Sequence, residues 1–419
     1  MTARAVRLHV RDPDLERSRL TVAFRLILAI PHFIWLAGWF SLAVVPVAIA
    51  NWIATLIQGS PAPMLHRFLA SYTRYAVHVT AYATLAADPY PGFAGRAGSY
   101  PIDVDIDPPG RQNRWVTGFR LFLALPAILL ADAMLGFGTS AVGGYATQVG
   151  GIVSTVAFFA WFVCLGRGQM PVGFRDVLAY TIGYSAQVNG YLLLLTDRYP
   201  TSDPAVYEGA NVFREDPIRV EVDDDLRRSR LTTFFRLPLV FPHLVWLTLW
   251  NIAVIFALIV NWFVTLFRGR PSGPIHRFVA RFVRYQTHVY AFLQLVANPF
   301  PGFTGRPGSY PVDVILPPPE RQARLVTGFR LILALPALFI SGGLNGVAFL
   351  AGIYSWFWGL LRGRVPRGLR NLGAYSLRYN AQTFGYTGLL TDRYPYTGPT
   401  AGWQLSLESP PPLAAPAPH

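Results

Sequence analysis

Arginine, histidine and aspartate are the residues of this sequence whose chemistry suits ligand binding or proton transfer. The chain has 419 residues, and its 36 basic residues, all arginine, outnumber 22 acidic ones to give a formal charge of +14. The absence of lysine excludes Schiff-base chemistry and lysine-dependent phosphate loops. Arginine remains suited to phosphate groups, because its planar guanidinium group donates paired hydrogen bonds.

Four arginines occupy equivalent places, each at the start of an apolar stretch and six residues before a proline. They are Arg25, Arg120, Arg236 and Arg330. Two interpretations stay open for this set. A ring of guanidinium groups would bind an anionic ligand, whereas separate arginines at helix starts would extend to lipid headgroups.

A second basic set recurs at spacings of seven and four residues, which place side chains on one face of a helix. Its members are Arg67, Arg74 and His78, repeated as Arg277, Arg284 and His288, and in part as Arg175 and Arg370. Gln187 and Gln382 replace the histidines in the last two copies, which leaves too few imidazoles for a metal site. We expect these side chains to contact anionic lipid or a protein partner, or to pair with Asp197 and Asp392.

Asp132 lies inside an apolar stretch, where a carboxylate is a candidate for proton or ion coupling. Its other interpretation is a residue close enough to a long loop to reach water. The sequence contains no readable catalytic triad, pair of catalytic carboxylates, cysteine–histidine cluster or glycine-rich phosphate loop. We therefore expect a protein that is not an enzyme and that uses no metal and no cofactor.

Apolar helices are the elements that must position these residues. Hydrophobic residues make up 52% of the chain and charged residues only 14%, whereas soluble domains carry about 25% charge. The apolar residues also come in long runs, which is typical of membrane proteins. In such a protein the positive charge favours the anionic cytoplasmic leaflet over nucleic acid as a partner.

Internal similarity divides the chain into four repeat units. Residues 18–40 return at 229–251, and each half is itself double. The predicted units are 1–98, 99–205, 206–305 and 306–398, followed by a tail at 399–419 that we expect to be disordered. The second unit is longer than the fourth, within a polar, glycine-rich segment. Since loops tolerate insertions, we predict that each apolar stretch is a hairpin with a loop near 38–41, 137–150, 248–251 or 341–346.

The predicted fold is therefore mainly α: a polytopic membrane protein of about eight short transmembrane helices in four hairpins. The hairpin loops lack charge, so all arginines are expected on the cytoplasmic side and all four units in one orientation, as parallel repeats. The remaining segments predict amphipathic helices at the membrane interface and short cytoplasmic β-strands. Four segments that alternate in polarity (VRLHV, YPIDVDID, IRVEVD and YPVDVIL) would pair in one small sheet.

The sequence also resembles a known family. The pattern SRLTxxFRLxLxxPH, followed by W…L.RG..P.G and a closing YxxLLTDRYP, is similar to the bacterial DUF4389 family of membrane proteins. Residues 229–301 and 321–395 match best, and four degenerate copies cover nearly the whole chain. The resemblance implies short paired membrane helices, and it brings no activity and no catalytic residues.

These observations favour a non-catalytic membrane scaffold or accessory subunit that engages anionic lipids or a membrane-protein partner through a cytoplasmic face of arginines and aromatic residues. We expect it in the bacterial inner membrane, multi-pass, with both termini cytoplasmic. One alternative is a transporter or channel with a path between parallel repeats. Another is an enzyme that acts on lipid through the cytoplasmic histidine, arginine and aspartate sets.

Overall fold

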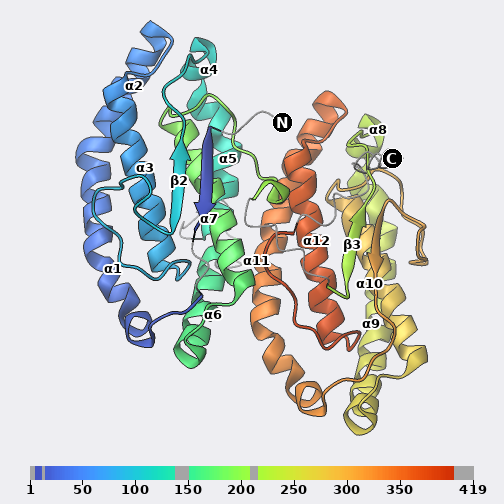
Figure 1. The fold of residues 1–419 in the computed structure, drawn as a ribbon. Coiled ribbons are helices and arrows are strands. Elements are labelled where there is room, and N and C mark those ends of the chain that lie inside the picture. The colour runs from blue at the N-terminus through green and yellow to red at the C-terminus, as the bar shows by residue number, and fades with distance from the viewer. Residues whose placement is uncertain (1–4, 12–14, 137–150, 208–215, 401–419) are drawn as a thin grey trace, which may run out of the picture.

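The computed structural model describes the chain except for residues 1–4, 12–14, 137–150, 208–215 and 401–419. The described residues are mainly helical, with two short pairs of strands (Figure 1). The predicted loop at 137–150 and almost all of the predicted disordered tail lie outside the described residues.

Each repeat unit contains a long apolar helical stretch. The first unit has α1 (Arg19–Trp39), a π-helical turn η1 (Phe40–Val44) and α2 (Val45–Gln58), and the second has α4 (Arg114–Gly118), α5 (Arg120–Leu135) and α6 (Ile152–Arg167). The third unit has α8 (Arg230–Phe234) and α9 (Arg236–Arg268), and the fourth has α11 (Arg324–Arg362). Three of these stretches, Arg25–Gln58, Arg236–Arg268 and Arg324–Arg362, are long and apolar enough to cross a membrane, which indicates a membrane protein.

The predicted hairpins are wrong at three of their four loops. Residues 38–41, 248–251 and 341–346 are helical, so each apolar stretch there is one helix. One glycine of the last segment, Gly343, permits close packing, since it lies against Ile152 of α6. In the second unit Gly136 lies directly against Gly151, so the two helix ends that flank the insertion adjoin each other. The insertion thus falls at a position where the fourth unit has the uninterrupted helix α11.

The π-helical turn η1 absorbs a single extra residue. Arg25 and Arg236 are 211 residues apart in the sequence, but His66 and His276 are only 210 apart. The first unit therefore has one more residue than the third between these points. Because hydrogen bonds from residue i to i+5 enclose an extra residue per turn, the helix keeps its direction instead of breaking.

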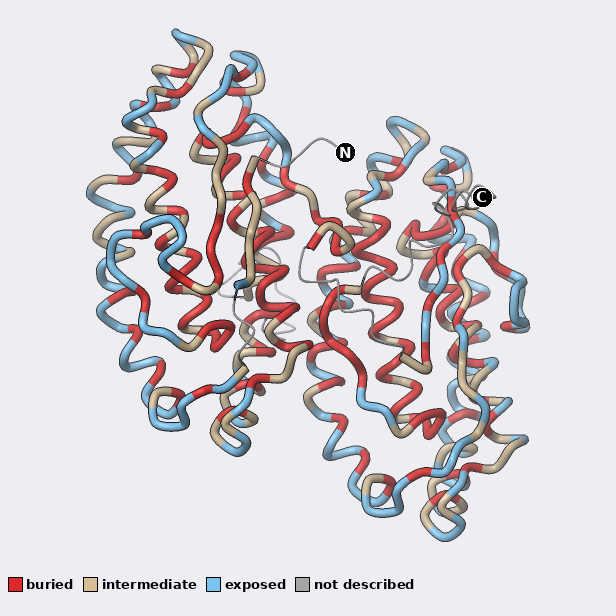
Figure 2. Tube along the Cα trace, viewed as in Figure 1, coloured by how far each residue is buried: buried red, intermediate tan, exposed pale blue. Residues whose placement is uncertain are grey.

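A second layer of helices packs against the long ones. Each unit contributes one helix of 21 residues: α3 (Pro63–Ala83), α7 (Val172–Leu192), α10 (Gly273–Leu293) and α12 (Arg367–Thr387). The central pair, α7 and α12, is buried along nearly its whole length (Figure 2). The expectation that these segments lie at the membrane interface is therefore wrong for α7 and α12, which the other layers cover.

Two antiparallel strand pairs form a third layer. β1 (Val6–Val10) pairs with β2 (Ile102–Ile106), and β3 (Arg219–Val222) pairs with β4 (Val312–Ile315). The first pair packs on α7 and α3, and the second on α12 and α10. The four strands lie at the predicted segments, but they form two separate ribbons instead of one sheet, because each half of the chain pairs its own two strands.

Neighbouring long helices run antiparallel. Trp52, near the end of α2, donates to the carbonyl of Thr117 at the start of the second unit (2.9 Å), and Trp161, in α6, donates to that of Val22 in α1 (3.0 Å). Trp262 and Trp356 make the same bonds to Thr327 and Thr233. A helix of 33 residues, such as α9, is about 50 Å long, so contacts at both ends require opposite directions. The predicted parallel repeats are therefore wrong, and arginines flank both ends of the layer.

The units follow the spatial order first, second, fourth, third. The long helices contact one another in this order, with α11 against α5 and α6 at the centre. The second-layer helices repeat the order, and Tyr180 of α7 meets Tyr375 of α12 edge to face at the junction of the halves. The chain thus has three layers: long helices, shorter helices, and ribbons (Figure 1).

Candidate functional site

The outer face of the long-helix layer is an exposed apolar surface. Shorter helices cover the inner face of every long helix, so the opposite face has no protein neighbour among the described residues. Leu20, Leu42 and Ile57 on the first long helix are 71%, 82% and 69% exposed. They stand at its start, middle and end, over about 55 Å of helix. Apolar surface of this extent marks an interaction site rather than ordinary protein surface.

The opposite face of the molecule carries charge. On the first ribbon, Arg7 pairs with Asp107 at 3.2 Å and His9 with Asp105 at 2.9 Å, and all four side chains are partly exposed. This ribbon crosses the middle of α3, where Arg74 Nε donates to the carbonyl of Val104 at 2.9 Å. A charged ribbon therefore lies at mid-length of the helices, on the side away from the apolar face.

The four arginines at the helix starts are buried separately instead of forming a ring. All are 2% exposed or less, and each guanidinium group bonds within its own unit. Arg120 donates to the carbonyls of Tyr191 (2.6 Å) and Thr196 (2.7 Å), just past the end of α7. Arg236, Arg330 and Arg25 make corresponding bonds to the ends of α10, α12 and α3. Because they are buried, these guanidinium groups can contact neither a shared anionic ligand nor lipid headgroups.

An aromatic ring covers each of these guanidinium groups. The carbon atom of the group lies 4.3 Å from the ring of Tyr82 for Arg25, and 4.4 Å from that of Tyr191 for Arg120. Phe292 and Tyr386 take the same place over Arg236 and Arg330. Desolvated cation–π contacts of this kind add to the hydrogen bonds that hold the end of each second-layer helix.

A further set of residues, which the sequence patterns did not single out, holds the same helix ends. Eight residues before each buried arginine stands an arginine or glutamine: Arg17, Gln112, Arg228 and Gln322. Each donates to the carbonyl of a leucine with positive φ that follows its second-layer helix: Leu85, Leu194, Leu295 and Leu389. The constant spacing of eight residues was the available signal, but it identifies a structural joint only when the acceptor carbonyls are known.

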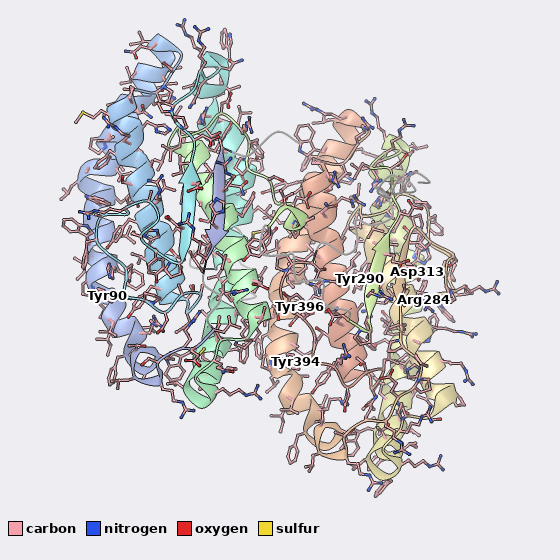
Figure 3. All side chains as sticks on the ribbon, viewed as in Figure 1. Tyr90, Arg284, Tyr290, Asp313, Tyr394 and Tyr396 are labelled. Atoms are coloured by element: carbon pink, nitrogen blue, oxygen red, sulfur yellow. The ribbon has the colours of Figure 1, made fainter. Side chains whose placement is uncertain are left out.

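His78 and His288 face the ribbons rather than lipid. His78 Nε2 lies 2.9 Å from Asp103 Oδ1, and His288 Nε2 lies 3.6 Å from Asp313 Oδ1. Arg284 also pairs with Asp313, at 3.0 Å, and Figure 3 shows the two side chains together. The prediction that the histidines pair with Asp197 and Asp392 is therefore wrong, because those aspartates lie at the ends of the second-layer helices. Asp392 pairs with Arg330 instead.

Hydrogen bonding keeps Asp103 ionised in its buried position. Burial alone would raise the pKa of this carboxyl group, but hydrogen bonds from His78 and from the backbone of Gly98 and Val104 outweigh it and lower the pKa from 3.8. The carboxylate thus fixes the turn at Gly98, the strand β2 and the helix α3 to one another. Its geometry is that of a structural cross-link.

The other predicted residues have different surroundings. Arg67 and Arg277 are exposed on the second layer, whereas Arg175 pairs with Asp176 at 2.8 Å and Arg370 is buried. Asp132 lies half-buried in the last turn of α5. Within the described part of the chain, histidine, cysteine and acidic side chains form no group of three or more that would hold a metal ion.

Exposed arginines mark both edges of the long-helix layer. We call Arg19, Arg114, Arg230 and Arg324, the first residues of their helices, the rim arginines; all four are exposed. Arg19 donates to the carbonyl of Gly166 (3.1 Å), Arg114 to that of Ile57 (2.8 Å) and Arg230 to that of Leu361 (3.2 Å). Each of these three thus caps the carboxyl end of the antiparallel neighbour, where the helix dipole favours positive charge.

Comparison with known proteins gives one family. The model of the family described as "Domain of unknown function (DUF4389)" matches residues 19–94, 230–304 and 324–397, which together are more than half of the chain. No curated protein and no solved structure matches the chain. The three matched ranges each begin at a long helix and extend beyond the end of its second-layer helix. The chain belongs to the DUF4389 family.

Proposed function

We propose that this protein is a non-catalytic membrane scaffold whose long helices lie along one leaflet of the membrane. The observation that carries the proposal is the distribution of polarity across the three layers. Exposed apolar side chains follow the whole length of the long helices on one face, and charged ribbons cover the opposite face. The membrane partner of such a molecule is a flat lipid surface.

An orientation along the leaflet accounts for the length of the apolar face. A bilayer core is about 30 Å thick, whereas the exposed leucines and isoleucine of the first long helix extend over about 55 Å. A steep crossing would leave nearly half of this face in water or headgroups. It would also bring the paired charges of Arg7, Asp107, His9 and Asp105 to the level of the hydrocarbon core, where charged groups are costly.

The rim arginines support a preference for anionic lipid. They stand where the apolar face ends, so their guanidinium groups are level with headgroup phosphates when the face rests on the leaflet. The formal charge of +14 adds a long-range attraction to an anionic surface. We place the protein on the cytoplasmic leaflet of a bacterial inner membrane, with both termini in the cytoplasm.

Depth measurements on spin-labelled cysteines test the orientation. The only cysteine, Cys164, is buried, so a Cys164→Ser background accepts single labels at Leu20→Cys, Leu42→Cys and Ile57→Cys. In phosphatidylglycerol vesicles the three labels should report one shallow depth. The matched control, Asp105→Cys on the ribbon, should stay accessible to a water-soluble quencher. A deep label at Leu42→Cys between two shallow ones would show a helix that crosses the bilayer and would overturn the proposal.

Flotation tests the lipid preference. Wild-type protein should associate more strongly with phosphatidylglycerol vesicles than with phosphatidylcholine vesicles. Replacement of the four rim arginines by glutamine should reduce this difference and leave the attachment to phosphatidylcholine. If the variant keeps the full preference, the rim arginines are not the contact with anionic lipid.

A further inference from the structure

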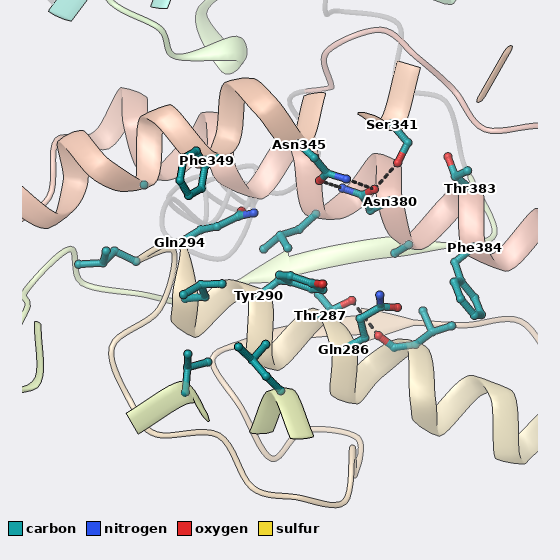
Figure 4. Close-up of a pocket in the computed structure, with 18 of the residues that line it drawn as sticks. Gln286, Thr287, Tyr290, Gln294, Ser341, Asn345, Phe349, Asn380, Thr383 and Phe384 are labelled. Carbon is teal, nitrogen blue, oxygen red and sulfur yellow. Dashed lines mark hydrogen bonds between the residues drawn. The ribbon is translucent and has the colours of Figure 1, made fainter. Parts of the chain in front are cut away.

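A cavity of about 890 Å³ lies between the third and fourth units. Its walls come from the long helices α9 and α11, and its floor from α10 and α12 (Figure 4). On α10 it extends from Val283 to Leu293, or about 15 Å along the helix. It is thus an elongated cleft whose long axis follows the helices.

The cleft lies on the side of the second layer that faces the long helices. The other side of α10 and α12 holds the ribbon, where Arg284 bonds to Val314 and Gln382 bonds to Ile218. Leu237 of α9 and Phe349 of α11 line the cleft and are 68% and 69% exposed, so the cleft opens between the long helices. Its mouth is therefore on the apolar face that we propose to rest on the leaflet.

Most of the lining is apolar, but α11 and α12 contribute uncharged polar groups. Asn345 and Asn380 join their amides, with Asn380 Nδ2 2.6 Å from Asn345 Oδ1, and Ser341 bonds to the same pair (Figure 4). The one charged residue of the lining is Arg236, whose guanidinium group is committed to the carbonyls of Phe292 and Ala297. The cleft thus offers hydrogen bonds to a ligand, and its one charged lining residue already holds the end of α10.

Three buried atoms of the lining have no hydrogen-bond partner among the described residues: Arg236 Nε, Gln294 Oε1 and Thr383 Oγ1. The Nε atoms of Arg25, Arg120 and Arg330 lack a partner in the same way, so this feature of Arg236 belongs to the helix joint, whereas the two oxygens are particular to the cleft. A buried carbonyl oxygen without a donor costs free energy, so it is commonly matched by a ligand or by water. The amide oxygen of Gln294 requires a donor, which a hydroxyl group supplies and an ester or a phosphate diester does not.

The first half of the chain lacks these groups at the equivalent positions. Thr84 stands where the second half has Gln294, and Val188 where it has Thr383. The same comparison gives Ala76 for Gln286, Thr80 for Tyr290, Leu135 for Asn345 and Ser185 for Asn380. Because both halves share one architecture, these amides and hydroxyl groups are not required by the fold itself.

We infer that the cleft binds a long-chain neutral lipid with a hydroxyl-bearing head, such as a diacylglycerol, taken up from the leaflet. The acyl portion lies along α9 and α11, and the hydroxyl group donates to Gln294 Oε1. This assignment rests on the proposed attachment to the membrane, because the ligand enters through the apolar face. An anionic lipid fits less well, since the one cation of the lining, Arg236, is already held by two backbone carbonyls and by the ring of Phe292.

Photo-crosslinking with a diazirine-bearing diacylglycerol tests the site in the full-length protein in phosphatidylcholine vesicles. The label should map to peptides of α9 to α12, and unlabelled diacylglycerol should compete better than phosphatidic acid with the same acyl chains. Gln294→Thr with Thr383→Val installs the residues of the first half, and should weaken labelling up to about tenfold, because the ligand hydroxyl loses its acceptor Gln294 Oε1. Thr248→Val, the same change at an exposed site of α9, should leave labelling unchanged.

Equal or stronger competition by phosphatidic acid would overturn the assignment of a neutral head. Labelling that the double variant does not change would overturn the site. Flotation of the same samples separates these results from a failure of membrane attachment: all variants should float with vesicles as the wild type does. A protein that floats normally but is not labelled in the cleft retains the proposed scaffold function and refutes the lipid site alone.

Discussion

Replacement of Arg236 by methionine should destabilise the third unit, because this arginine holds the end of α10. Its guanidinium group is 1% exposed, donates to the carbonyls of Phe292 and Ala297, and lies over the Phe292 ring. Methionine fills similar space but leaves two buried acceptors without donors.

The magnitude follows from opposing contributions. Each buried carbonyl without a donor costs about 1–3 kcal/mol. Removal of the buried cation recovers part of its desolvation penalty, which is several kcal/mol for an ion in a protein interior. The net loss in the free energy of unfolding should be about 2–4 kcal/mol. Denaturation in detergent micelles, followed by near-ultraviolet circular dichroism, measures this quantity.

Arg230→Met is the matched control. Arg230 lies six residues earlier, is exposed, and bonds to one carbonyl at 3.2 Å, so its loss should change stability much less. If Arg236→Met were as stable as the wild type, the structural role of the buried arginines would be refuted. A guanidinium group without a structural role would then be available for a ligand or for headgroups.

Two further predictions concern the ribbons and the turns beside them. Gly305→Ala should cost more than about 2 kcal/mol in the same assay, since φ is +57° and a Cβ would lie 2.3 Å from the carbonyl oxygen of Arg281; Gly302→Ala, in open space, should be neutral. The pKa of Asp103 is lowered from 3.8, so its contribution to stability is present above that pH and is lost as the pH falls below it towards the folded-state value. Asp103→Asn should flatten this acid-dependent loss in thermal melts at stepped pH, whereas Asp105→Asn, on the exposed side of the ribbon, should preserve it.

The sequence was sufficient to predict the apolar helices, the four repeated segments and the four strands. The amphipathic spacing of Arg74 and His78 also predicted a helix face correctly, and that face packs on β2. Local periodicity is enough for such predictions, because it depends on residues within two turns of one another. Local periodicity does not predict which ribbon or helix will pack on that face.

The hairpins were mispredicted because length and turn-like residues are ambiguous in apolar sequence. Glycine at 343 and 346 is compatible with a loop, and equally with a close helix crossing, which the contact of Gly343 with Ile152 produces. Once the long stretch is one helix, its two ends separate by about 50 Å and the expected common side for all arginines disappears. The buried arginines and the cleft depend on this antiparallel packing, so neither was readable from spacing.

Antiparallel packing of like units also has a consequence for how this molecule can specialise. The first two units pair antiparallel through reciprocal contacts, made by Trp52 in one unit and Trp161 in the other, so they resemble a symmetric homodimer. The two halves also meet at equivalent residues, Tyr180 and Tyr375. The chain is in effect a tetramer joined covalently. A tetramer of identical subunits must repeat every substitution four times, whereas a fused one can change a single copy. Fusion therefore permits one half to place Gln294 and Thr383 around a cleft while the other half keeps Thr84 and Val188 at the equivalent positions.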